Sequence, residues 1–153
     1  MRRRQSNLGG LALCIIACLI VLATAPAAFA DGSSKGRGEG GRFAVYYPII
    51  AKYNKSGELF RIEGVCRSAC TLFLSIRNVC VDRGALLAFH AGPDRKTKLR
   101  GPDTSSSRAM LAAYKPALRR YLLDGHHMDT SAYHTLSGAT LIDKFGYPAC
   151  KPQ

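Results

Sequence analysis

Apolar and polar residues alternate in short blocks along most of the chain, and the spacing within each block predicts helices and strands. Residues 59–64 alternate apolar and charged side chains, which is typical of a strand, whereas residues 68–76 form an apolar block that indicates a buried helix. We also predict a short helix over residues 46–53 and strands over residues 79–81 and 85–89. Strand, helix and strand in succession are typical of a parallel unit, so the sequence predicts an α/β fold.

A polar loop is expected over residues 92–106, followed by a longer helical stretch with one apolar face that ends near Gly125. Pro116 lies inside this stretch. Because proline lacks a backbone donor and clashes with the preceding turn, the stretch is either one kinked helix or two helices, the second starting at Pro116. Ser137 and Gly146 bracket a last short helix.

The first 30 residues have the organisation of an export signal. Three consecutive arginines are followed by an apolar run over residues 8–23 and by an A-x-A ending at Ala30. We predict that residues 1–30 are a cleavable signal peptide and that the mature chain begins at Asp31, which makes the protein periplasmic or secreted. The alternative is a retained membrane anchor; on the signal-peptide interpretation, the chain meets the membrane only through this segment before cleavage.

Residues 31–42 read DGSSKGRGEGGR and show no apolar periodicity, so they form either a flexible leader or a glycine loop. The length of the remainder favours a single domain over residues 43–153. Hydrophobic residues make up 47% of the 153-residue chain, which excludes a wholly disordered protein.

Positive charge is in large excess, with 22 Lys and Arg against 10 Asp and Glu and a formal net charge of +12. Three of these cations belong to the predicted signal, so most of the excess stays with the exported domain. Such charge attracts anionic lipid headgroups, envelope polymers or acidic peptides. Nucleic acid is not a predicted partner, because no stacking-aromatic motif or recognised binding module accompanies the charge.

Four cysteines remain after the signal, an even number in an exported domain, and they are disulfide candidates: Cys66, Cys70, Cys80 and Cys150. All three pairings are open. A helix between Cys70 and Cys80 would hold those two apart, so Cys80 to Cys150 is slightly favoured.

We predict no metal site and no cofactor. Cys66-x3-Cys70 lacks the second close pair of a zinc site. Three histidines lie outside any recognised ligand pattern and are interpreted as surface residues: His126, His127 and His134.

Candidate chemistry is concentrated at Ser68. A strand is followed by a tight turn that places this serine at a helix N-terminus, where the backbone N–H of Ala69 can donate to a developing oxyanion. His90 ends the strand at 85–89, and a neighbouring parallel strand would bring it to Ser68 as a general base. The alternative interpretation is that Ser68 caps the helix and His90 is structural.

Three segments carry a family resemblance: CRSACTL at residues 66–72, VCV at 79–81 and AFHA at 88–91. Together they resemble the predicted periplasmic proteins related to the proteolytic subunit of Clp protease (ClpP), within the crotonase-like superfamily. Weaker similarity extends over most of residues 40–150. The resemblance implies a ClpP/crotonase-like fold of stacked β-β-α units, reduced in size.

The resemblance also implies residue roles. Ser68 would be the nucleophile and His90 the general base, and the oxyanion would be held by the backbone N–H groups of Ala69 and Gly41. Asp129 is the nearest candidate, by order along the chain, for the acid that orients the histidine.

Two functions follow. One is an exported serine hydrolase, peptidase-like, that acts through an acyl-enzyme on Ser68. The other is a non-catalytic, disulfide-stabilised cationic domain that binds anionic envelope components on the same scaffold. In either case a basic loop after His90 is expected to rim the cleft and select a peptide or other anionic ligand, through Arg95, Lys96, Lys98 and Arg100.

Overall fold

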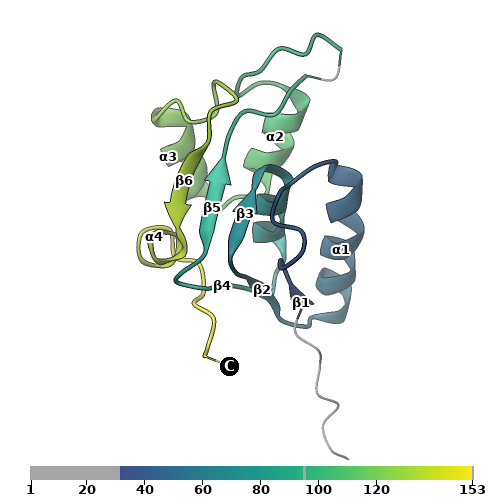
Figure 1. Cartoon of the computed structure of the whole chain (residues 1–153), viewed down its shortest axis with the longest axis vertical. Coiled ribbons are helices and arrows are strands. Elements are labelled where there is room, and N and C mark those ends of the chain that lie inside the picture. Colours follow the sequence, from purple (N-terminus) through teal and green to yellow (C-terminus); the bar gives the residue numbers. More distant parts are fainter. Residues whose placement is uncertain (1–31, 95, 153) are drawn as a thin grey trace, which may run out of the picture.

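The computed structural model describes residues 32–94 and 96–152. They form a mixed α/β arrangement of two small sheets and several helices (Figure 1). The predicted signal peptide at residues 1–30 and the predicted rim residue Arg95 lie outside the described residues. The α/β class predicted from the sequence is confirmed.

The first sheet is parallel throughout and has the order β1-β2-β4. Its strands are β1 (Gly32–Ser33), β2 (Phe60–Ile62) and β4 (Val79–Val81). All six residues of β2 and β4 are buried. Burial of consecutive residues is typical of parallel strands covered on both faces, and the one charged member, Arg61, donates a hydrogen bond to the Lys151 carbonyl.

The second sheet has the order β3-β5-β6 and mixes directions. Its strands are β3 (Val65–Arg67), β5 (Leu86–Phe89) and β6 (His134–Ser137). β5 pairs in parallel with β3 and antiparallel with β6. The parallel pairing matters for the site, because it brings the carboxyl ends of β3 and β5 to the same edge.

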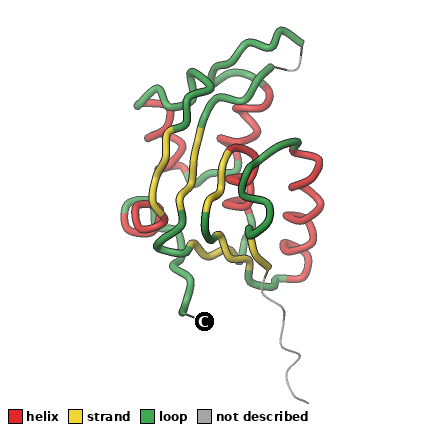
Figure 2. The backbone as a smooth tube through the Cα atoms, in the orientation of Figure 1, coloured by secondary structure: helices red, strands yellow, loops and turns green. Residues whose placement is uncertain are grey.

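Among the described residues, five helical segments surround the sheets (Figure 2). They are α1 (Phe43–Ser56), the 3-10 helix η1 (Ser68–Ser75), α2 (Ser105–Ala112), α3 (Pro116–Asp124) and α4 (Gly138–Asp143). Within residues 32–94 and 96–152, no helix is long and apolar enough to cross a membrane.

Aromatic side chains join α1, η1 and the first sheet into one core. Tyr46 of α1 packs against Phe73 of η1 with ring centroids 5.2 Å apart, and Phe73 lies 4.5 Å from Phe60 of β2. All three are almost fully buried. This contact fixes the 3-10 helix, and therefore its first residue Ser68, between α1 and the sheet.

Pro116 and Ser137 mark the starts of two helices, and the structure decides between the alternatives left open at Pro116. Pro116 is the first residue of α3, so the long apolar stretch is two helices. Ser137 caps α4 by accepting a hydrogen bond from the Thr140 backbone N–H. The apolar block after Ser68 is a 3-10 helix, which the sequence analysis treated only as a buried helix.

Two disulfides are present in the part of the chain that the structure describes. Cys80 pairs with Cys150, as slightly favoured from the sequence, and Cys66 pairs with Cys70. The first pair ties β4 to the C-terminal tail across 70 positions, whereas the second closes a short loop around Ser68.

Candidate active site

Ser68 stands at a sharp turn between β3 and η1, with a backbone φ of 51°. A non-glycine residue adopts this left-handed conformation uncommonly, and such residues gather at active sites. In strand-turn-helix hydrolases a comparable turn exposes the nucleophile. The sequence indicated the turn but not its strained backbone, because no flanking glycine marks it.

A buried hydrogen-bond chain supports the turn from below. The Thr71 hydroxyl donates to the Ser68 carbonyl at 2.6 Å and lies 2.6 Å from the Tyr114 hydroxyl. Since the single Thr71 proton is used on Ser68, Tyr114 must donate to Thr71. Burial raises the pKa of the Tyr114 hydroxyl above its ordinary value, which keeps it a donor. Neither residue was singled out from the sequence as a support for Ser68.

The glycine-rich segment packs directly on the Ser68 turn. Gly38 accepts a hydrogen bond from the Arg67 N–H at 2.7 Å. Gly40 has φ of 80°, and a Cβ there would lie 2.9 Å from the Ser68 Cβ and 2.8 Å from the Arg67 carbonyl oxygen. The described part of residues 31–42 begins with β1, and its glycines at positions 38 and 40 contact the Ser68 turn.

His90 reaches Ser68 through the pairing of the second sheet. Arg67 of β3 lies in register with Ala88 of β5, so the residues that follow both strands meet. The His90 Nε2 atom is 2.7 Å from the Ser68 Oγ. The structure thus brings together the two residues that the sequence indicates as nucleophile and base.

The other ring nitrogen of His90 makes no hydrogen bond of good geometry within the described residues, although the Ala91 backbone is close enough to raise the pKa of the ring. His90 is 8% exposed, and its Nδ1 atom is buried. Asp129, the acid suggested from chain order, does not lie there: its carboxylate is 2.9 Å from Nδ1 of His126. Order along the chain was a wrong guide to the partner of Asp129, because the carboxylate pairs with a histidine only three residues away.

The environment of His90 favours its neutral form. Burial lowers the pKa of the imidazole below 6.5, and the positive charge of Arg100 lowers it further, while the Ala91 backbone acts weakly in the opposite direction. A neutral imidazole at pH 7 is the form that accepts a proton.

Of the basic loop, Arg100 is the cation placed beside His90. Its Nη1 donates to the Ala91 carbonyl at 2.8 Å. Lys96 and Lys98 are exposed and lie in a turn organised by Asp94, whose carboxylate accepts the Lys96 backbone N–H at 2.9 Å. Among the described loop cations, Arg100 is therefore the one whose charge acts on His90, and none of Lys96, Lys98 and Arg100 is a lining residue of the cleft at Ser68.

A cleft of about 370 Å³ opens at Ser68. The glycine loop and the start of α1 form one wall, and residues after His90 together with α2 form the other. Its apolar surface comes from Phe43, Ala44, Pro93 and Met110, and Arg42 lies at its margin.

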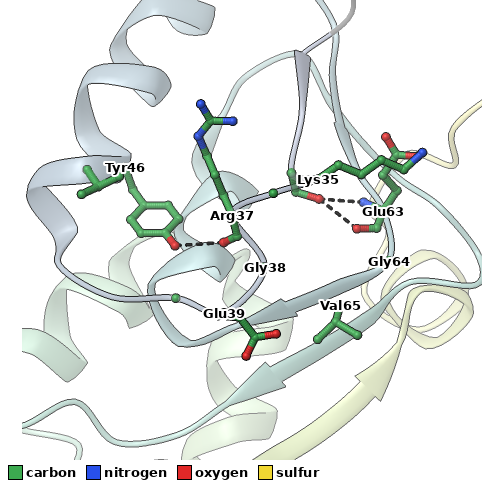
Figure 3. Close-up of a pocket in the computed structure, with 12 residues that line it drawn as sticks. Lys35, Arg37, Gly38, Glu39, Tyr46, Glu63, Gly64 and Val65 are labelled. Carbon is green, nitrogen blue, oxygen red and sulfur yellow. Dashed lines mark hydrogen bonds and ion pairs between the residues drawn. The ribbon is translucent and has the colours of Figure 1, made fainter.

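A larger cavity of about 510 Å³ uses the glycine loop as a wall but not Ser68 or His90 (Figure 3). Tyr46 points from α1 to the Arg37 carbonyl, and Lys35 pairs with Glu63 at 3.1 Å. Its cations and carboxylates balance, and no hydroxyl–imidazole pair lies in it. The smaller cleft is therefore the candidate active site.

Two of the remaining histidines, His127 and His134, form a separate group, whereas His126 pairs with Asp129. The rings of His127 and His134 stack with centroids 3.4 Å apart, and the Tyr121 hydroxyl is 3.1 Å from the His134 Nε2. Burial, and then the neighbouring His127, lower the pKa of His134. No group of three or more potential metal ligands occurs among the described residues.

No family model, curated protein or solved structure matches the chain in the comparisons with known proteins.

Arg100→Gln is expected to raise the pKa of His90 toward its ordinary value of 6.5, because it removes the nearby positive charge that opposes protonation. NMR titration of the imidazole measures this midpoint. Arg120→Gln removes the same charge from an exposed position on α3 and should leave the midpoint in place. Identical midpoints in wild type and Arg100→Gln would show that the Arg100 charge does not lower the pKa of His90.

The depressed pKa of His90 also makes stability depend on pH. The unfolded chain binds the imidazole proton near pH 6.5, and the folded chain binds it only at lower pH. Stability from the neutral imidazole is therefore complete above pH 6.5 and decreases as the pH falls toward the folded-state pKa. Arg100→Gln should narrow the pH range over which this stability is lost, because it raises the folded-state pKa of His90 toward 6.5.

Proposed function

We propose that the protein is an exported serine hydrolase, peptidase-like, with a ClpP/crotonase-like arrangement in which Ser68 is the nucleophile and His90 the general base. The observation that carries the proposal is the 2.7 Å contact between Ser68 Oγ and His90 Nε2 at a serine with left-handed backbone. A structural cap would need neither the histidine nor the strained turn. The resemblance of the segments around both residues to the Clp-related periplasmic proteins points the same way.

The positions of the protons on Ser68 and His90 suit base catalysis. For Nε2 to accept the Ser68 proton, the neutral imidazole must carry its own proton on Nδ1. Ser68 Oγ then attacks the substrate carbonyl carbon as its proton passes to Nε2. The resulting imidazolium returns that proton to the leaving amine when the C–N bond breaks, and water hydrolyses the acyl-enzyme by the same route in reverse.

The oxyanion of the tetrahedral intermediate would meet backbone donors on both sides of Ser68. Ala69 is the second residue of η1, so its N–H belongs to the unpaired first turn of that helix. Gly41 belongs to the glycine loop and lines the cleft. These N–H groups are already held in place by the packed backbone, so they need not reorient during the reaction. Such preorganised donors provide most of the stabilisation of an oxyanion.

The absence of a described carboxylate at Nδ1 of His90 sets a low rate. No described carboxylate stabilises the imidazolium that forms during acylation, and among the described residues only the Ala91 backbone favours its charge. Arg100 opposes that positive charge. The dyad is therefore proposed to acylate more slowly than a site with an orienting acid.

A fluorophosphonate probe tests the proposal, because it labels serines activated by a base. Wild-type protein should be labelled, Ser68→Ala should not, and His90→Ala should react about 10²-fold more slowly, the usual contribution of a general base. Ser75→Ala is the control: this exposed serine ends the same 3-10 helix and donates only to the Leu72 carbonyl.

Absence of labelling in wild-type protein with native circular dichroism would refute the hydrolase proposal, as would labelling that survives Ser68→Ala. The alternative from the sequence, a non-catalytic cationic binding domain, would then be the better account. That domain predicts salt-sensitive binding of anionic envelope components.

A further inference from the structure

Two arginines without acidic partners lie in or next to the cleft at Ser68: Arg42 is one of its lining residues, and Arg100 forms a backbone bridge with the lining residue Pro93. Arg100 is also held against the Ala91 carbonyl, one residue after His90. Neither belongs to an ion pair among the described residues, although carboxylates elsewhere pair with Lys35, Arg67 and Arg83. No residue that lines the cleft is acidic.

The backbone adds to this positive potential. α1 begins at Phe43 and α2 at Ser105, and neither helix has an acidic residue in its first turn. Residues from both first turns line the cleft. Unpaired N–H groups at helix N-termini carry partial positive charge, which reinforces the field of the two arginines.

The walls of the cleft are nevertheless apolar. Phe43, Ala44 and Met110 face a space of about 370 Å³, which is the lower end of the range for small-molecule sites. A matching ligand must therefore present an apolar group and an anion close together. An apolar residue at the end of a peptide meets this requirement, because its own free carboxylate supplies the anion.

We propose that the cleft recognises the free C-terminal carboxylate of peptides that end in small apolar residues, with Arg42 and Arg100 as its binding residues. Cleavage of such peptides rests on the proposed function, whereas recognition does not. In the reaction, Ser68 Oγ bonds to the last peptide carbonyl carbon, the C–N bond breaks, and the terminal amino acid leaves with a proton from His90. Water then releases the shortened peptide.

Binding of the carboxylate would also improve the base. An anion at Arg100 offsets the positive charge that opposes protonation of His90. When a ligand carboxylate is bound at Arg100, the imidazolium formed during acylation is therefore less strongly destabilised by electrostatic repulsion. Substrates without the carboxylate gain no such benefit, so recognition and reactivity are coupled through Arg100.

A pair of matched peptides tests recognition without turnover. N-acetyl-Ala-Ala and its C-terminal amide differ only in the charged end, and Ser68→Ala protein prevents cleavage. NMR titration, followed at the His90 imidazole, should give at least about ten-fold tighter binding of the acid, as expected for charge-assisted hydrogen bonds. The preference should shrink as salt rises.

Substitution of the arginines in the Ser68→Ala background shows which residues cause the preference for the peptide acid over the amide. Arg42→Gln and Arg100→Gln should each reduce it several-fold, and the double substitution should abolish it, whereas Arg120→Gln on α3 should leave it unchanged. Equal binding of acid and amide, no binding of either at millimolar concentration, or a preference that survives the double substitution would each overturn the proposal. Fluorophosphonate labelling of wild type is a separate readout, so failure of recognition and failure of catalysis are distinguishable.

Discussion

Simultaneous replacement of Cys80 and Cys150 by alanine is expected to lower the free energy of unfolding by about 4 kcal/mol. The bond joins β4 to the C-terminal tail across 70 positions, so its loss restores a large amount of chain entropy to the unfolded state. For a domain of this size the expected fall in melting temperature is roughly 15 °C. Thermal and denaturant unfolding measure both quantities.

The Cys66–Cys70 bond is the matched control for this prediction. It closes a loop of only four positions, so the same chain-entropy argument gives about 2 kcal/mol. Its loss should instead affect the site, because it encloses Ser68. Equal losses of stability from the two double substitutions would show that loop length does not set the contribution of the longer disulfide.

Gly40→Ala is expected to slow fluorophosphonate labelling about 10²-fold with a smaller effect on folding. The new Cβ would lie 2.8 Å from the Arg67 carbonyl oxygen and 2.9 Å from the Ser68 Cβ, so the serine turn must shift. Displacement of a catalytic atom by about 1 Å is enough for a loss of that size. The labelling rate at matched folded fraction is the measurement.

Gly36→Ala separates this steric effect from the backbone effect. Gly36 also has a positive φ, of 75°, but a Cβ there would meet nothing within 4 Å. It should therefore cost about 1–2 kcal/mol of conformational energy, as Gly40→Ala does, with little change in labelling. If both variants react at the same rate, contact between the glycine loop and Ser68 is not what positions the serine.

Local sequence signals were sufficient where one residue type dictates the backbone. Pro116 starts α3 because proline fits the first turn of a helix and not its interior. β4 lies where its continuous apolar run predicts, and β5 begins one residue later than expected. The proximity of Ser68 and His90 could be anticipated because parallel neighbouring strands end at the same edge.

Three short strands were not predicted from the sequence, because their stability depends on hydrogen bonds to neighbouring strands. β1 has two residues in a glycine-rich segment, and β3 and β6 have three and four residues without clear alternation. Each exists because a neighbouring strand satisfies its backbone hydrogen bonds. Propensity within so few residues is too weak to indicate them.

By itself, the sequence determined the α/β class, a kink or division of the long helical stretch at Pro116, and the serine and histidine that form the candidate site. Only the tertiary structure decided what surrounds them: the strained backbone of Ser68, the glycine loop packed on it, and the buried Nδ1 of His90, which has no described carboxylate partner. It also placed Asp129 on His126 rather than on His90. The physical reason is that periodicity and turn chemistry act within a few residues, whereas these features depend on contacts between segments distant along the chain.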